Sequence, residues 1–422
     1  MNAKKIVFRN GLRLILAPQP SSFAASVLIL VEAGSEYERK RTNGLSHFLE
    51  HMTFKGTARR PRPGMIAEEL AALGAQSNAF TTQEFTGYWA KVEAGKLPKA
   101  LDIVSDLYLN PLFEAEEIEK ERGVVIEELN MYEDMPMRRV QDIFLSLLYG
   151  DQPAGWDVGG EKKIIRKLTR DDFIAYRGER YVMPGTIVVV AGKFSKKAVV
   201  RQIRGAFGDL ARRPAPRKPA TRERQASPKA FLKFKGSDQG HLVLGYRAFD
   251  IFDKRRYALQ ALVDILGGGM SSRLFKRVRE ELGAAYYVHA DADLLLDHGV
   301  MDVSAGVDHK KIEIVLQAIL EECGKLSKDL VPAEELQRSK DHMIGGLLLG
   351  IETSDELASF YGGQEVLLRS LSSPEEAIRK IKKVTAGEIR AVARAIFKKK
   401  GLNLAIIGPY RNRATFQKIL NG

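Results

Sequence analysis

Apolar residues recur with two different spacings along the 422-residue chain, one typical of strands and one typical of helices. Short stretches of alternating apolar residues, such as ASVLILVEAG (25–34) and HLVLGYRAF (241–249), predict strands. Longer stretches with helical spacing, such as 96–109 and 310–326, predict helices. The two types do not alternate regularly, so the order of elements favours an α+β fold over a doubly wound parallel sheet.

The segment GLSHFLEHMTFKGT, residues 44–57, is a predicted helix with two different faces. Because successive helical residues are rotated by about 100°, four apolar side chains are separated from a polar group. The apolar stripe holds Leu45, Phe48, Leu49 and Met52, and the opposite face holds His47, Glu50 and His51. Two imidazoles four residues apart can bind one metal ion, and the adjacent glutamate can reach water held by that metal. A solvated polar face is the alternative interpretation.

A third zinc ligand, often a carboxylate, completes sites of this kind. A helical projection of residues 114–136 predicts one apolar stripe. It consists of Ile118, Val124, Val125, Leu129 and Tyr132. Glu121 and Glu128 fall inside this stripe, whereas Glu127 falls outside it. A carboxylate on a buried face needs a partner or a cation, which favours Glu128 over Glu127 as a ligand. An ordinary acidic helix surface is the alternative.

These motifs resemble those of the inverzincin peptidases, the H-x-x-E-H family that includes pitrilysin, insulin-degrading enzyme and mitochondrial processing peptidase. The resemblance covers nearly the whole chain, including NGLRLIL, GAQSNAFTTQEFTGYWAKV, YVMPGTIVVVAGKF and GGGMSSRLFKRVREELGAAYYV. It implies that His47, His51 and Glu128 bind Zn2+, that Glu50 is the catalytic base, and that Glu121 supports the metal ligands. It also implies two similar domains, each a mainly antiparallel sheet covered by helices.

The second half of the chain is a predicted copy of the first. AEEIEKERGVVIEEL from Ala115 matches AEELQRSKDHMIGGL from Ala333, and VVVAGKF matches LAIIGPY near the C-terminus. The first pair of matched segments is separated by 333 minus 115 positions. Adding this difference to the numbers of the zinc-site residues leads to positions without metal-binding side chains. These positions are Ile265, Gly268, Gly269 and Gly346. We therefore expect the second copy to serve structure or substrate contact.

A basic, proline-rich stretch separates the two copies. The predicted domains are a zinc-binding domain at 1–211, a linker at 212–230 and the second copy at 231–422. The prolines predict a stiff, extended linker outside either core. The net charge of +13 raises a nucleic-acid-binding alternative. However, the basic runs lack interleaved aromatic residues for base stacking.

Composition fits a soluble enzyme with more than one domain, since 45% of residues are hydrophobic and 28% are charged. No apolar run is long enough to span a bilayer, and no signal or transit peptide is evident. The single cysteine, Cys323, excludes an internal disulfide and favours a reducing compartment. We expect a cytoplasmic protein without membrane or nucleic-acid partners.

The resemblance also assigns residues outside the zinc motif. VREELGAAY supplies Arg279 and Tyr286 at the spacing of an arginine and a tyrosine that stabilise charge in the family's transition state. A helix-surface arginine and a core tyrosine are the alternative. The resemblance further points to Asn78, Ala79 and Phe80 as substrate contacts. Their stretch has a composition that suits an edge strand pairing with an extended peptide.

The resulting hypothesis is a zinc-dependent endopeptidase in which Glu50 passes a proton from the attacking water to the leaving amine. Longer family members fold as two bowl-like halves that enclose a chamber, and this chain corresponds to one half. A homodimer with composite active sites is therefore expected. Three alternatives stay open: a presequence-processing peptidase with narrow specificity, a catalytically silent assembly subunit, and a nucleic-acid binder.

Overall fold

Two sheets with related strand orders form the framework of the computed structural model, which describes residues 3–421. The first sheet has the order β1 (Lys4–Val7), β2 (Arg13–Pro18), β6 (Thr186–Gly192), β3 (Ala24–Val31), β5 (Thr86–Glu93), β4 (Gln76–Thr81). The second has the order β7 (Lys229–Phe234), β11 (Asn403–Gly408), β8 (Gln239–Ala248), β10 (Gly299–Asp308), β9 (Ala285–Leu294). The parallel pairs are β2–β6 and β7–β11, and the other neighbours are antiparallel. The predicted α+β fold with two mainly antiparallel sheets is confirmed.

The two compact units exchange segments between the halves of the chain. Unit 1 contains the residues up to Leu129, Trp156–Pro219 and Leu347–Pro374, and unit 2 contains Asn130–Gly155, Ala220–Gly346 and the residues from Glu375 onward. The sequence suggested contiguous domains, 1–211 and 231–422. The exchanged segments carry α5 (Pro136–Tyr149), which packs on the second sheet, and α12 (Ser354–Leu368), which packs on the first.

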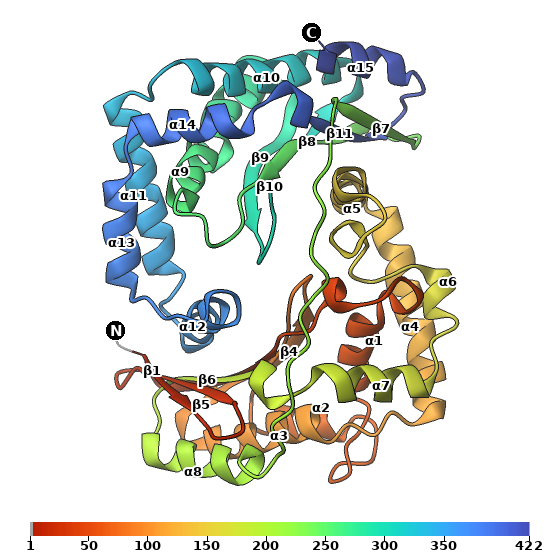
Figure 1. Cartoon of the computed structure of the whole chain (residues 1–422), viewed down its shortest axis with the longest axis vertical. Coiled ribbons are helices and arrows are strands. Elements are labelled where there is room, and N and C mark those ends of the chain that lie inside the picture. The colour runs from red at the N-terminus through yellow and green to blue at the C-terminus, as the bar shows by residue number, and fades with distance from the viewer. Residues whose placement is uncertain (1–2, 422) are drawn as a thin grey trace. The chain divides into compact units, whose positions relative to one another are not determined.

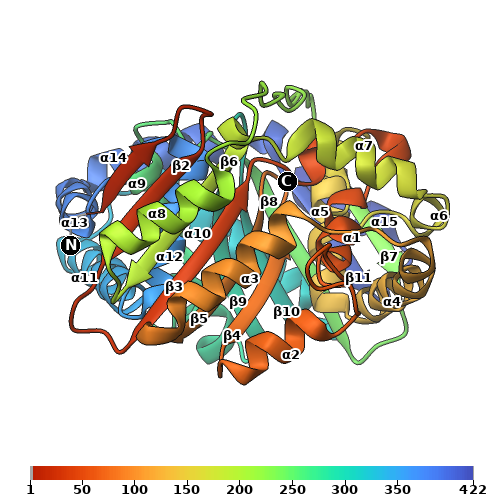
Figure 2. The same ribbon diagram turned by 90° about the horizontal axis from the view of Figure 1, so that it is seen from below.

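In unit 1 the sheet has an apolar layer on both faces. Helices α3 (Leu97–Leu109) and α8 (Lys196–Phe207) lie on one face, and α12 lies on the other (Figures 1 and 2). Along β3, Val27 and Ile29 face the first layer, and Leu28 and Leu30 face α12. Burial of both faces explains why this strand reads as a continuous apolar run.

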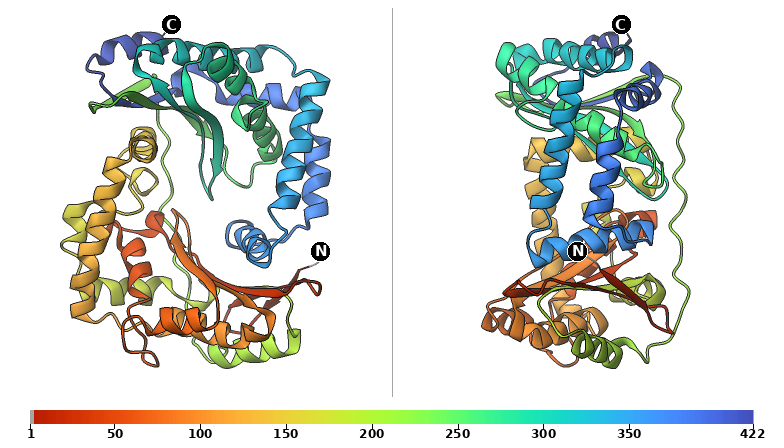
Figure 3. Two further views of the ribbon diagram at one scale, coloured as in Figure 1. Left: turned by 180° about the vertical axis from the view of Figure 1, so that it is seen from behind. Right: turned by 90° about the vertical axis from the view of Figure 1, so that its left-hand side faces the viewer.

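Unit 2 repeats this arrangement. The face of its sheet opposite α5 is covered by α9 (Arg256–Gly267), α10 (Ile312–Lys328) and α14 (Ala386–Ile396), as Figure 3 shows. Cys323 lies in this core and is 2% exposed. Each sheet therefore receives one covering helix from the other half of the sequence.

The remaining helices include the two that contain the matched segments of the predicted repeat. Unit 1 contains α1 (Leu45–Met52), α2 (Met65–Ala72), most of α4 (Ala115–Asp134), α6 (Lys162–Ile165) and α7 (Arg170–Arg180). Unit 2 contains most of α11 (Ala333–Leu349), α13 (Pro374–Lys383) and α15 (Arg413–Asn421). The matched segments begin α4 and α11 at Ala115 and Ala333, which confirms the repeat. Of the helices described, none has the length and apolar composition of a membrane span.

The linker is partly anchored to unit 1. Residues 211–225 contain no helix or strand, in agreement with most of the linker predicted at 212–230, whereas its last two residues already belong to β7. Lys218, however, is buried in ion pairs with Glu36 and Glu84, and its Nζ lies 2.7 Å from Glu84 Oε1. The expectation that the linker stays outside both cores was therefore wrong at Lys218, because two buried carboxylates require a cation there.

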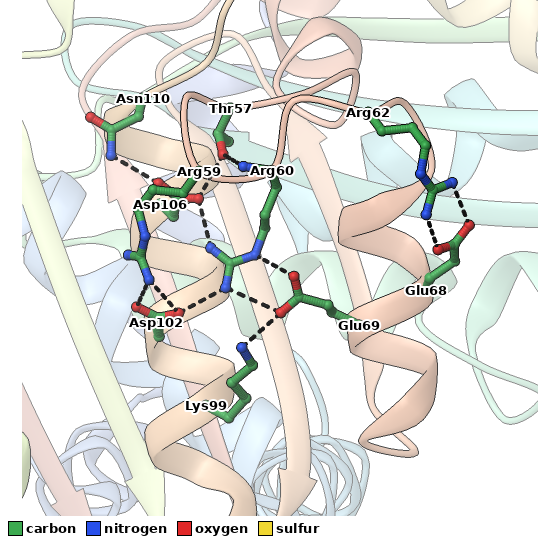
Figure 4. Close-up of polar contacts among 10 residues, drawn as sticks. All are labelled: Thr57, Arg59, Arg60, Arg62, Glu68, Glu69, Lys99, Asp102, Asp106 and Asn110. Atoms are coloured by element: carbon green, nitrogen blue, oxygen red, sulfur yellow. Dashed lines mark hydrogen bonds and ion pairs between the residues drawn. The ribbon is translucent and has the colours of Figure 1, made fainter.

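The loop that follows α1 is held by a buried arginine (Figure 4). Arg60 is 3% exposed, and its guanidinium reaches Glu69 on α2 and Asp102 and Asp106 on α3. Its Nη1 lies 2.6 Å from Asp106 Oδ2, and Asp106 also accepts from Thr57 Oγ1 at 2.7 Å. These contacts connect the loop after α1 to two neighbouring helices.

Candidate metal centre

The helix that carries both histidines packs its apolar face into the core of unit 1. The predicted stripe, Leu45, Phe48, Leu49 and Met52, is at most 1% exposed. The three polar residues, His47, Glu50 and His51, are partly exposed on the other side of α1. Burial of the apolar stripe thus fixes the direction of the polar face.

A buried glutamate outside the motif fixes the start of α1. Gly44 has φ 92°, a left-handed conformation that suits glycine, and its N–H donates to Glu38 Oε2 at 2.7 Å. The N–H of Ser46 donates to Glu38 Oε1 at 2.6 Å. Burial raises the pKa of Glu38 to about 7, although these backbone donors lower it. Sequence reasoning missed Glu38 because nothing in its local pattern marks a helix cap six residues away.

The three predicted zinc ligands converge between α1 and α4. The Nε2 atoms of His47 and His51 are 3.3 Å apart, and Glu128 Oε2 lies 3.6 Å from the first and 3.4 Å from the second. In a tetrahedral zinc site with bonds of about 2.0–2.2 Å, neighbouring ligand atoms are about 3.3–3.6 Å apart. The triangle therefore fits one zinc ion, to which the residues that the structure describes contribute three ligand atoms.

The register of α4 separates the two neighbouring glutamates. Glu121 is 6% exposed and Glu128 is partly buried, whereas Glu127 is exposed. Val124 is 51% exposed, so its predicted place in the buried stripe was wrong. It precedes the fully buried Val125 by one residue, or about 100° of helical rotation, and so turns toward solvent.

Glu121 orients one of the histidines. Its Oε1 lies 3.0 Å from His51 Nδ1, and its other oxygen forms an ion pair with Lys55. Burial lowers the pKa of His51, but the carboxylates of Glu121 and Glu128 reverse this effect and raise it to about 9. The carboxylates that favour a protonated imidazole also favour a metal cation at this position, and Glu121 fixes the ring that would bind it.

Glu50 is held by a threonine that sequence reasoning did not single out. Thr81 Oγ1 donates to Glu50 Oε2 at 2.6 Å. Burial raises the pKa of Glu50, and the hydrogen bond from Thr81 opposes this shift. Thr81 is the last residue of β4, so it connects the predicted base to the predicted substrate strand. Its place beside the stretch SNAF was the only available signal.

Strand β4 lies at the edge of the first sheet, as predicted. Asn78 is exposed, and its Oδ1 accepts from the N–H of Ala79 at 2.9 Å. Ala79 is buried. Phe80 is partly buried against β5, where a Cβ on Gly87 would lie only 2.3 Å from its ring. Phe80 therefore packs on the sheet, and Asn78 is the most accessible of the three predicted contacts.

Arg279 and Tyr286 belong to unit 2, whereas the zinc-site residues and Glu50 belong to unit 1. Arg279 is exposed in a π-helical segment, Phe275–Glu281, with its guanidinium 5.0 Å from the ring centroid of Phe275. Such segments often occur at functional sites. Tyr286 is on β9 and is 76% exposed, which excludes the alternative of a core tyrosine.

Two family descriptions match the sequence. Residues 13–161 match the insulinase description of peptidase family M16, and residues 167–343 match the description "Peptidase M16 inactive domain". The chain belongs to peptidase family M16. The expected membership of the insulinase family is therefore confirmed. The second match agrees with the copy that lacks the zinc residues, in which Ile265 is a buried residue of α9.

The chain is also similar to proteins of similar length that are named zinc proteases. An uncharacterized zinc protease of Mycobacterium tuberculosis is 34% identical over 99% of this chain and 95% of its own length. The uncharacterized zinc protease YmxG of Bacillus subtilis is 32% identical over 97% of this chain and 99% of its own. The crystal structure of a protease from Helicobacter pylori has a TM-score of 0.91 at 23% identity, covering 97% of this chain and 99% of that one. This last similarity shows the fold.

Proposed function

We propose that this chain is a zinc-dependent endopeptidase that hydrolyses peptides or unfolded segments. The triangle of His47, His51 and Glu128 carries the proposal, because its edges of 3.3, 3.4 and 3.6 Å suit one tetrahedral zinc ion. Relatives named zinc proteases support the same assignment.

Glu50 acts as the general base. Zinc bound by the triangle would supply Lewis acidity toward the scissile carbonyl and would acidify water. Glu50 accepts the proton of the attacking water and delivers it to the leaving amine. Thr81 binds one carboxylate oxygen at 2.6 Å and so orients the other toward the reaction. Because burial raises the pKa of Glu50, this carboxylate can hold the proton between the two steps.

The substrate binds as an extended peptide. An edge strand offers main-chain hydrogen bonds, so β4 with Asn78, Ala79 and Phe80 can pair with a peptide backbone. This mode tolerates many side chains. Arg279 and Tyr286 are exposed, and in a homodimer that encloses a chamber they act on the zinc site of the partner subunit.

Two alternatives lead to different expectations. A silent assembly subunit would not require the zinc ligands and the base, so the convergence of His47, His51, Glu128 and Glu50 in unit 1 disfavours it. A presequence-processing peptidase would use the same site with narrower specificity, and it differs only in the sequences that it cleaves.

Metal analysis together with a peptide library tests the proposal. We expect about one zinc per chain and cleavage of unstructured peptides that is lost with a chelator and restored with zinc. Full activity in metal-free protein would contradict the zinc mechanism. Zinc-loaded protein that cleaves no peptide would favour the silent subunit. Cleavage restricted to one position in targeting peptides would identify a processing enzyme.

A further inference from the structure

A pocket of about 500 Å³ lies in unit 2, and none of its lining residues belongs to the predicted zinc site. It opens between the loop before α9 and the turn that joins α13 to α14. Its lining includes Phe252, Lys254, Arg256, Tyr257, Lys380 and Lys383. Pockets for small molecules typically have volumes of about 300–1,000 Å³, so this one can hold a ligand of nucleotide size.

The lining carries an excess of positive charge. Five of its side chains are lysine or arginine, and two, Asp253 and Glu388, are carboxylates. Both carboxylates already have partners. Asp253 Oδ2 accepts from Arg255 Nη2 at 2.6 Å, and Glu388 Oε2 accepts from the N–H of Thr385 at 2.8 Å. Asp253 offsets the charge of Arg255, and Glu388 keeps its own negative charge, so five cations minus two carboxylates leave an excess of three positive charges in the lining.

The cations come from separate segments and converge on one ring. The Arg256 guanidinium and the Lys380 ammonium lie 5.3 and 5.7 Å from the centroid of Tyr257. Lys254 and Lys383 are exposed, and no described residue forms an ion pair with either. Cations gathered at one opening repel one another, and an anion that enters the pocket relieves this repulsion.

One further feature narrows the class of ligand. The start of α9 adds little attraction for an anion, because Asp253 Oδ1 already accepts from the backbone N–H of Arg255 there at 2.7 Å. Phe252 is 55% exposed in the lining and offers a ring on which a planar group can stack. Several lysine and arginine side chains suit the many oxygens of a phosphate chain. We propose that the pocket binds a small phosphate-bearing molecule of nucleotide size.

Calorimetric titration with three probes tests this proposal: ATP, inorganic pyrophosphate and adenosine. We expect ATP and pyrophosphate to bind with dissociation constants below about 1 mM at low salt, and adenosine not to bind measurably. Binding should weaken as salt is added, because the attraction is electrostatic. We expect Phe252→Ala to weaken ATP binding and to leave pyrophosphate binding unchanged.

The lysines provide the decisive variant. Lys254→Gln combined with Lys383→Gln should raise both dissociation constants roughly tenfold or more. The matched control combines Lys196→Gln with Lys197→Gln, which removes two exposed lysines from α8 in unit 1. The control should leave binding unchanged. The zinc ligands are intact in the native protein, the lysine variant and the control. Any heat from the chelation of zinc by ATP or pyrophosphate is therefore the same in all three.

Several results would overturn the proposal. Absence of pyrophosphate binding at millimolar concentration would show that the pocket is not an anion site. Equal binding by the lysine variant and the control would show that the anion binds outside this pocket. Equal affinity for ATP and pyrophosphate would contradict a ligand of nucleotide size. Binding of an oligonucleotide without binding of pyrophosphate would assign the cations to nucleic acid.

Discussion

Glu127 and Glu128 are neighbours in sequence but differ in environment. Glu128 Oε2 lies within 3.6 Å of both histidine Nε2 atoms, whereas Glu127 is exposed. We expect Glu128→Gln to lose most bound zinc, because a neutral amide replaces an anionic ligand, and Glu127→Gln to keep it. Metal content after gel filtration measures the difference. Loss of zinc only from Glu127→Gln would show that the assigned ligand is wrong.

Substitutions at Glu50 and Thr81 test whether catalysis can be separated from metal binding. We expect Glu50→Gln to retain about one zinc per chain and to lose at least about 100-fold in kcat, the usual contribution of a general base. Thr81→Val should lower kcat with little change in KM, since it removes the hydroxyl that orients Glu50. Thr81→Ser should restore kcat. A Thr81→Ser variant as impaired as Thr81→Val would mean that the threonine acts through packing alone.

At the scale of elements, the Arg60 network holds the loop after α1 against α2 and α3 (Figure 4). Arg60→Met leaves the fully buried Asp106 without its cation and should lower the free energy of unfolding by about 3–5 kcal/mol. Urea denaturation measures this change. Arg62→Met is the matched control, because Arg62 forms an exposed pair with Glu68 and should matter little. Equal effects of the two substitutions would contradict the role of burial.

The same network predicts a dependence of stability on pH. The hydrogen bond from Arg60 lowers the pKa of Glu69. Burial raises the pKa of Asp102, but the contacts with Arg60 and Arg59 outweigh burial, so the net shift of this pKa is also downward. Carboxylates with lowered pKa values stabilise the fold above their unfolded pKa values of about 4 and lose this contribution as pH falls further. The stability difference between the native chain and Arg60→Met should therefore narrow from pH 7 to about pH 3. A constant difference would contradict this coupling.

At the scale of the whole molecule, the proposed homodimer predicts complementation between two inactive variants. Homodimers of Glu50→Gln and of Arg279→Ala should each be nearly inactive. After subunit exchange, activity should return in the mixed dimers, because one zinc site then has both a normal Glu50 and the partner's normal arginine. Peptide cleavage and native mass spectrometry measure activity and exchange. Continued inactivity in proven mixed dimers would show that Arg279 does not act across an interface.

A cytoplasmic location also stays a prediction.

Much of the candidate site is local in the sequence, which explains why it could be predicted. His47, Glu50 and His51 lie within two helical turns, so the apolar stripe of α1 alone sets their common face. The same argument selected Glu121 and Glu128 on α4. It failed for Val124 because a periodic pattern defines the centre of a stripe better than its margin.

The sequence by itself determined the family, the two-copy design, several of the strands and helices, and the faces of α1 and, apart from Val124, of α4. Only the tertiary structure decided which distant residues meet, such as Glu38 with the start of α1, Thr81 with Glu50, and Lys218 with Glu84. It also decided the exchange of α5 and α12 between the two units. Helical periodicity depends on neighbours within a few residues, whereas long-range contacts depend on how buried faces and buried charges find partners across the fold.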